Sequence, residues 1–130
     1  MSEFELYEKT LASQQIFDGK ILELWHDEVE LPNGRKTHRE VVRHRGAAAV
    51  VALTDDQNVI LVRQFRYPYG KLLTEIPAGK LEPNEEPLTC AKRELKEETG
   101  YGAAHFYRLS SIYCSPAYCD ETIHLFLATG

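Results

Sequence analysis

A long hydrophobic run is the first thing that this chain of 130 residues lacks. No segment approaches the roughly 20 consecutive apolar residues that a membrane-spanning helix needs. The opening residues, MSEFELYEKT, also lack the basic and apolar regions of a secretory signal peptide. We therefore expect a cytoplasmic protein with no membrane partner.

Cysteine is scarce, and its spacing is not that of a disulfide framework or a zinc site. The chain has three cysteines, Cys90, Cys114 and Cys119, which is an odd number without metal-pair spacing. Free thiols in a reducing compartment are the expected state, and they agree with the predicted cytoplasmic location.

Positive charge is also in deficit, since 15 Lys and Arg face 20 Asp and Glu, for a net charge of −5. Nucleic acid is therefore not expected as a partner, because its phosphates require a basic surface. The basic residues that do occur are concentrated in two places, residues 35–45 and the Arg63–Arg66 segment with its aromatic neighbours. Such local patches in an acidic chain suit a small anionic ligand.

What the chain does contain predicts an α+β fold with one modest core, since 43% of its residues are hydrophobic. Residues 1–45 are expected to form an antiparallel three-stranded meander, with hairpin turns of positive φ at Asp18-Gly19 and Asn33-Gly34. Residues 46–130 are expected to form a second domain. Its predicted strands are 47–53, 58–64, 71–76, 106–113 and 122–128, with one long helix among them.

The helix is expected to begin near Pro87, with Asn84 or Glu85 as its cap, because a proline in the first turn loses no intrahelical hydrogen bond. Gly100 can end the helix in a left-handed conformation. The predicted apolar stripe consists of Leu88, Ala91 and Leu95.

The last turns of this helix carry Glu94, Glu97 and Glu98, although the helix dipole disfavours negative charge at that end. Glu94 and Glu98 are four residues apart and repel each other. A solvated helix face is one interpretation, because Arg93 can pair with Glu97. The joint register of glycines, arginine and glutamates favours the other interpretation, a site for Mg²⁺ or Mn²⁺ rather than zinc.

The segment GKLEPNEEPLTCAKRELKEETGY resembles the signature of the Nudix hydrolases, with Tyr101 where a bulky aliphatic residue is usual. The matched positions are Gly79, Glu85, Arg93, Glu94, Leu95, Glu97, Glu98 and Gly100. The resemblance implies a mixed sheet with a loop-helix-loop that binds divalent metal and hydrolyses a nucleoside diphosphate linked to another group.

Carried over by position, the resemblance implies that Glu94 and Glu98 are the principal metal ligands. It implies that Glu97 is a direct or water-mediated ligand and that the carbonyl of Ala78 is a main-chain ligand. Glu85 and Arg93 are expected to brace the loop, and Arg93 is counted with the three glutamates as part of the catalytic set.

Further stretches resemble the ADP-ribose pyrophosphatase branch, namely Arg63–Tyr67, Glu75–Gly79 and Pro116, which lies sixteen residues after Gly100. The implied reaction converts ADP-ribose, or a related nucleotide sugar, to AMP and ribose 5-phosphate. In that branch two subunits exchange the N-terminal meander, which implies a homodimer whose meander lies at the partner's adenosine pocket.

The remaining site predictions concern the substrate and the attacking water. Arg45 and Arg66 are candidates to hold the phosphates, because guanidinium groups match phosphate oxygens bidentately. Trp25 is a candidate to stack on adenine, although a tryptophan in a core or an interface is the commoner case. The resemblance places the general base beyond the last strand of this chain, with Glu121 as the substitute.

Two expectations stay open at this stage. The resemblance implies a further strand and a closing helix after Ala128, so the chain is expected to be a truncated piece of a longer protein. The alternatives to ADP-ribose are an oxidised nucleoside triphosphate, a dinucleoside polyphosphate, or nucleotide binding without turnover.

Overall fold

The computed structural model describes residues 3–130, which fall into two compact units. The first unit runs to His44 and also includes Cys114–Glu121. The second unit consists of Arg45–Tyr113 and Thr122–Gly130. Among the described residues, no helix has both the length and the apolar character needed to cross a membrane.

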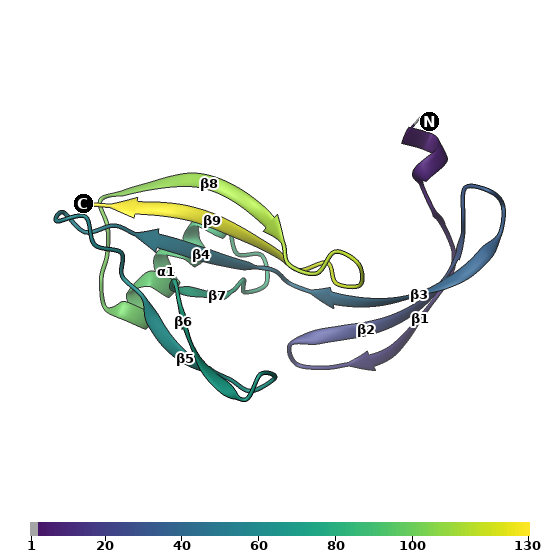
Figure 1. The fold of residues 1–130 in the computed structure, drawn as a ribbon, viewed down its shortest axis with the longest axis horizontal. Helices are drawn as coiled ribbons and strands as arrows, with labels where there is room; N and C mark the ends of the chain where they lie inside the picture. Colours follow the sequence, from purple (N-terminus) through teal and green to yellow (C-terminus); the bar gives the residue numbers. More distant parts are fainter. Residues whose placement is uncertain (1–2) are drawn as a thin grey trace. The chain divides into compact units, whose positions relative to one another are not determined.

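The first unit is built on an antiparallel three-stranded sheet, which confirms the predicted meander (Figure 1). A short 3-10 helix, η1 (Glu3–Leu6), precedes it. The strands follow one another in chain order across the sheet, with register pairs such as Trp25 opposite Val41. They are β1 (Lys9–Asp18), β2 (Leu22–Glu30) and β3 (Lys36–His44).

Cys114–Glu121 is a loop that hydrogen-bonds to β3. The N–H of Val42 donates to the carbonyl of Tyr118 at 2.7 Å, and the N–H of Asp120 donates back to the carbonyl of Val42 at 3.0 Å. This reciprocal pair ties the loop to the sheet of the first unit, although the loop lies far along the sequence from β3.

One of the two predicted hairpin turns has the expected geometry. Gly34 has a φ of 85°, and its N–H donates to the carbonyl of Leu31 at 2.9 Å. The prediction of positive φ at Asp18-Gly19 is wrong, because neither residue is among the described residues with positive φ. A Cβ at Gly19 would instead lie 2.7 Å from Cε1 of Phe17, so glycine is needed there for space.

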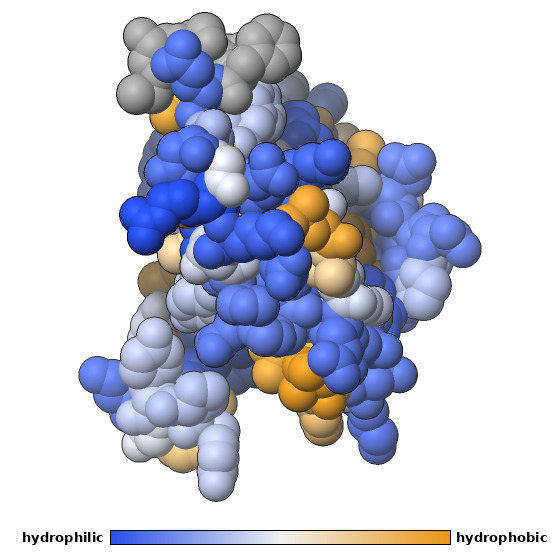
Figure 2. All heavy atoms as spheres, turned by 90° about the vertical axis from the view of Figure 1, so that its right-hand side faces the viewer, coloured by the Kyte–Doolittle hydropathy of each residue, from blue (hydrophilic) through white to orange (hydrophobic). Residues whose placement is uncertain are grey.

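The first sheet carries several exposed hydrophobic side chains, among them Ile16, Phe17 and Ile21, each more than half exposed. Figure 2 shows the protein from the right-hand side of Figure 1, where orange hydrophobic residues are scattered among blue hydrophilic ones. The sheet of this unit therefore does not bury all of its apolar residues within the chain.

The second unit contains a four-stranded mixed sheet with the order β7-β4-β9-β8, and a separate hairpin of β5 and β6. β4 pairs in parallel with β9, and the other pairs are antiparallel. The strands are β4 (Ala47–Ala52), β5 (Val62–Arg66), β6 (Lys71–Glu75), β7 (Ala78–Lys80), β8 (His105–Tyr113) and β9 (Thr122–Thr129). These strands and the single α-helix confirm the α+β prediction, although β7 was not expected.

The helix α1 (Pro87–Thr99) packs against β4, β7 and β9 (Figure 1). The prediction that Leu88 belongs to the buried stripe is wrong, because its side chain is 39% exposed. Cys90, fully buried, lies on the packed face with Ala91 and Leu95 instead. The core of the unit consists of Ala48, Val50, Ala52, Cys90, Ala91, Leu95, Phe126 and Ala128.

The two ends of α1 differ in how well the sequence predicts them. Gly100 ends the helix at a φ of 79°, and its N–H donates to the carbonyl of Lys96 at 2.8 Å, as expected. The N-cap is Glu86 and not Asn84 or Glu85, and its side chain makes no capping hydrogen bond. Glu85 is engaged elsewhere, by Arg93.

Candidate active site

Arg93 connects the loop before α1 to the helix itself. Its Nε donates to Glu85 Oε2 and its Nη2 donates to Glu85 Oε1, each at 2.9 Å. Nη2 also donates to the carbonyl of Lys80 at 3.3 Å, and the N–H of Glu82 donates to Glu85 Oε1 at 3.0 Å. The Glu85 side chain is only 8% exposed, and Arg93 lowers its pKa to about 2. The loop is therefore held to the helix by a two-point ion pair.

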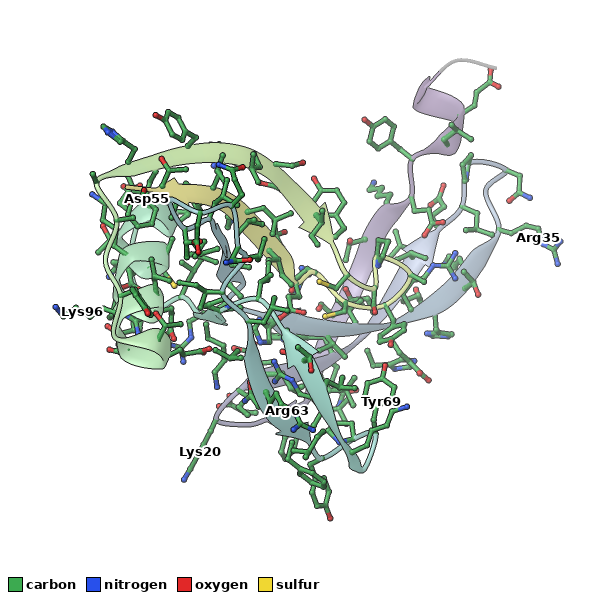
Figure 3. The ribbon with its side chains drawn as sticks, turned by 60° about the vertical axis from the view of Figure 1, so that its left-hand side comes forward. Lys20, Arg35, Asp55, Arg63, Tyr69 and Lys96 are labelled. Carbon is green, nitrogen blue, oxygen red and sulfur yellow. The ribbon has the colours of Figure 1, made fainter. Side chains whose placement is uncertain are left out.

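The same guanidinium group also holds two of the helix-end glutamates. Nη1 of Arg93 donates to Glu94 Oε1 at 2.7 Å and to Glu97 Oε2 at 3.3 Å. The carboxylate of Glu85, followed by that of Glu94, raises the pKa of Arg93 above its ordinary value. Part of the charge repulsion expected at the end of α1 is thus offset by one arginine. Lys96, in contrast, projects from the helix away from the sheet (Figure 3).

Glu94 lies against the backbone of Gly79 in β7. A Cβ built on Gly79 would lie 2.0 Å from Glu94 Cδ and 2.2 Å from its Oε1. A side chain at position 79 would therefore force the Glu94 carboxylate, the end of a flexible side chain, to move. The Glu94 side chain is 12% exposed. Its carboxylate is therefore fixed between the strand and Arg93.

Glu98 lies one helical turn beyond Glu94. Its pKa is raised by partial desolvation and by the negative charge of Glu94, whereas the N–H of Ala78, hydrogen-bonded to the carboxylate, acts in the opposite direction. Two carboxylates that repel each other next to a backbone strand form a set of hard oxygen donors, and divalent cations such as Mg²⁺ prefer such donors. The residues present therefore fit a hard divalent cation.

Arg66 and Glu75 form a second ion pair close to this site. Arg66 Nε donates to Glu75 Oε2 at 2.8 Å, and Nη2 donates to Oε1, so the pair is bidentate across β5 and β6. Arg66 lowers the pKa of Glu75 and offsets part of the rise in the pKa of Glu98. The predicted phosphate-binding Arg66 thus lies near Glu98. Arg63 and Tyr69 belong to the same hairpin (Figure 3).

The side chains are not arranged as a complete metal cage. Within residues 3–130, no group of three or more His, Cys, Asp or Glu side chains is placed to hold a metal ion. Glu97 is 59% exposed and contacts Arg93. The structure therefore brings together Ala78, Glu94, Glu98, Arg93 and Arg66, with Glu97 on the outer side of Arg93.

The remaining predicted residues are Arg45, Trp25, Pro116 and Glu121, and each is described within its own unit. Arg45 belongs to the second unit and is exposed. Trp25, Pro116 and Glu121 belong to the first unit. Trp25 is partly buried and donates from Nε1 to Glu23 Oε1 at 2.8 Å. Pro116 is exposed, and Glu121 Oε2 lies 3.4 Å from Nδ1 of His44.

Sequence reasoning assigned no role to Cys90, yet its side chain contacts the backbone of β7, the strand that carries Gly79. Its Sγ lies 3.6 Å from the carbonyl oxygens of both Gly79 and Lys80. Burial, followed by the charge of Glu85, raises its pKa to about 11. The signal was its spacing of four residues from Glu94, which puts both side chains on the helix face that meets the loop.

Comparison with known proteins identifies the class to which this fold and site belong. Residues 42–129 match the NUDIX domain, and residues 8–42 match the nucleoside diphosphate sugar hydrolase N-terminal domain. The chain therefore belongs to the Nudix family.

Three relatives are similar over nearly all of the chain. It is 52% identical to an ADP-ribose pyrophosphatase of Bacillus subtilis (strain 168), over 95% of this chain and 66% of that protein. It is 50% identical to a methanol dehydrogenase activator of Bacillus methanolicus, with the same two coverages. It is 41% identical to an ADP-ribose pyrophosphatase of Mycobacterium tuberculosis (strain ATCC 25618 / H37Rv), over 94% of this chain and 59% of that protein.

The chain thus spans just under two thirds of the length of these curated relatives. A crystal structure of an ADP compounds hydrolase has the same fold, with a TM-score of 0.83 at 24% identity. That match covers 95% of this chain and 68% of the other.

Proposed function

We propose that this protein hydrolyses the diphosphate bond of ADP-ribose or a related nucleoside diphosphate sugar, with AMP and ribose 5-phosphate as the products from ADP-ribose. The observation that carries the proposal is the fixed carboxylate of Glu94, held by Arg93 against Gly79 with Glu98 beside it. The match of residues 8–42 to a nucleoside diphosphate sugar hydrolase domain and the names of two relatives support the substrate class.

The cofactor in this proposal is Mg²⁺ or Mn²⁺. Glu94 and Glu98 would hold it, with Glu97 and the carbonyl of Ala78 as further ligands. A divalent ion so bound neutralises charge on the diphosphate and lowers the pKa of an attacking water. Arg93 is a positioning residue, because its hydrogen bond fixes one carboxylate and its ion pair with Glu85 fixes the loop.

The proposed substrate contacts concern the phosphates, the adenine and the attacking water. Arg66, already near Glu98, and the exposed Arg45 would hold the phosphates through charge-assisted hydrogen bonds. Trp25 would stack on adenine, and Pro116 would shape the adjoining loop. Glu121 would orient or deprotonate the attacking water, and its contact with His44 gives it a partner for the proton.

We also propose a homodimer that acts in the cytoplasm. Exposed hydrophobic side chains on the first sheet, among them Ile16 and Phe17, support association with a second copy, because a sheet face of this kind is stabilised when it is covered. The free thiols of the three cysteines suit a reducing compartment.

The test is an incubation with ADP-ribose and Mg²⁺, with the products separated by anion-exchange chromatography. Release of AMP and ribose 5-phosphate in equal amounts supports the proposal. An oxidised nucleoside triphosphate and a dinucleoside polyphosphate, offered under the same conditions, serve as competitors. A higher kcat/KM for either competitor would overturn the substrate class, and ADP-ribose binding without any AMP would overturn the enzymatic role itself.

A further inference from the structure

Cys114 and Cys119 flank a short turn in the first unit. The carbonyl of Ser115 accepts hydrogen bonds from the N–H groups of Tyr118 at 3.1 Å and Cys119 at 2.8 Å. This turn reverses the chain between the two cysteines. The turn is also held to β3 by the reciprocal hydrogen bonds of Val42 with Tyr118 and Asp120. These bonds restrain the backbone of the turn.

Both cysteine side chains contact the same residue, Glu121. The carboxylate of Glu121 lies close enough to the Cys114 thiol to raise its pKa, and the N–H of Glu121 donates to Sγ of Cys119 at 3.5 Å. The turn closed on the Ser115 carbonyl brings its two ends together, and the two cysteines stand at these ends. Cys114 is exposed and Cys119 is partly buried, so a small molecule in solution can reach the first thiol and the second can follow.

The third cysteine provides the contrast. Cys90 is completely buried in the core of the second unit, so a small-molecule disulfide in solution does not reach it. The described residues contain no set of three or more His, Cys, Asp or Glu side chains placed to bind a metal. The two cysteines near Glu121 are therefore considered for the reactions of free thiols.

We infer that Cys114 and Cys119 form a reversible intramolecular disulfide by exchange with a small-molecule disulfide such as glutathione disulfide. The thiolate of one cysteine attacks the glutathione disulfide and releases one glutathione thiolate. The other cysteine then attacks the mixed disulfide, forms the Cys114–Cys119 bond and releases the second glutathione. Two protein thiols are oxidised to one disulfide, one glutathione disulfide is reduced to two glutathione molecules, and the two protein protons leave with the products.

The disulfide does not depend on the proposed hydrolysis. Its formation would change the surroundings of Glu121, the residue proposed to act on the attacking water. Formation of the bond removes the thiol hydrogen of Cys114 from the vicinity of the Glu121 carboxylate. Burial and the nearby Glu121 raise the pKa of Cys114, so the exchange is expected to speed up as the pH rises above neutrality. The bond would also link the two ends of the turn covalently.

The test uses the reduced protein in glutathione redox buffers at pH 8, with samples quenched in acid, alkylated and measured by intact mass spectrometry and peptide mapping. The expected product is a monomer that has lost the mass of two hydrogens, with Cys114 and Cys119 in one cross-linked peptide and Cys90 alkylated only after denaturation. Dithiothreitol should restore the starting mass. Cys114→Ser and Cys119→Ser should each stop at a mixed disulfide with glutathione, and Cys90→Ser should behave like the unmodified chain.

Three results would overturn the inference. The first is a mixed disulfide that persists on Cys114 of the unmodified chain, which would show that Cys119 does not reach it. The second is a cross-link between Cys114 residues of two copies. The third is a cross-link that includes Cys90. None of these readouts requires turnover, so failure here is distinguishable from failure of the proposed hydrolysis.

Discussion

The backbone of Gly79 lies directly against the carboxylate of Glu94, at a distance where an added Cβ would force the carboxylate to move. Strand β7 and helix α1 therefore meet at this point through a glycine and a charged side chain, with Arg93 on the other side of the carboxylate. The position of Glu94 is set by three parts of the fold, namely the strand, the helix and the arginine. This contact makes position 79 a direct probe of the site.

Gly79→Ala should displace the Glu94 carboxylate, because the new Cβ would overlap it. The carboxylate ends a flexible side chain and can move aside, so we expect little change in the free energy of unfolding, whereas a displaced reacting group lowers turnover by about 100-fold. Thermal unfolding and the rate of AMP release measure the two effects. Gly102→Ala is the matched control, since no atom lies within 4 Å of its added Cβ. A fully active Gly79→Ala protein would contradict the contact.

Glu98→Gln should abolish turnover and keep the fold, because it removes one charged oxygen ligand while it preserves the shape of the side chain. Glu86→Gln is the control, since Glu86 caps α1 through its backbone and its side chain makes no capping hydrogen bond. The measurement is kcat with ADP-ribose at saturating Mg²⁺, beside a circular dichroism spectrum. Equal rates for Glu98→Gln and the unmodified protein would remove Glu98 from the site.

Mg²⁺ or Mn²⁺ should raise the melting temperature of the unmodified protein. A cation that binds only the folded state at 100 times its Kd adds about 2.7 kcal/mol to the free energy of unfolding. Glu98→Gln should melt higher than the unmodified protein without metal, because repulsion by Glu94 is relieved, and should gain little from the metal. A metal-induced increase of equal size in both proteins would place the cation elsewhere.

The sequence predicted most of the fold because its elements rest on short-range periodicity. The alternating residues of the N-terminal meander and the apolar run of β4 fall where expected, and Gly100 ends α1 as predicted. Two local details differed for physical reasons. Gly19 does not have a positive φ, and its lack of a side chain instead leaves room for the ring of Phe17. Cys90, and not Leu88, lies on the packed face of the helix.

From residue spacing alone, the contacts of the site could be predicted only within the helix. The pair of Arg93 and Glu97 follows from their spacing of four residues. The contact of Gly79 with Glu94 could not be read from spacing, because it depends on how β7 and α1 pack together. The link between Arg66 and Glu75 depends likewise on the register of the β5–β6 hairpin.

Arg93→Lys should lower kcat about 100-fold through misplacement of Glu94, because an ammonium group cannot reproduce the bidentate bond to Glu85 and the bond to Glu94 together. Arg108→Lys is the control, since Arg108 lies in β8 and donates to Ser111. Steady-state kinetics with ADP-ribose give kcat and KM separately. A change in KM alone would show that Arg93 binds substrate and does not position Glu94.

The ion pair of Glu85 with Arg93 should make stability depend on pH in the acid range. The folded state lowers the pKa of Glu85 from 4.5 to about 2. A carboxyl group with a lowered pKa in the folded state contributes stability above its unfolded pKa, and this contribution is lost as the pH falls toward the folded pKa. The melting temperature of the unmodified protein should therefore fall between about pH 4.5 and pH 2 in part because of this group.

Glu85→Gln should remove this part of the acid dependence, because the amide does not titrate, and it should lower the melting temperature at pH 7, where the ion pair is complete. Melting curves at pH 7, 5, 4 and 3 give the comparison, with Glu86→Gln as the control that keeps the slope of the unmodified protein. If the melting temperatures of Glu85→Gln and of the unmodified protein change in parallel across this pH range, the pair with Arg93 contributes no pH-dependent stability. The loop would then be held by its backbone hydrogen bonds alone.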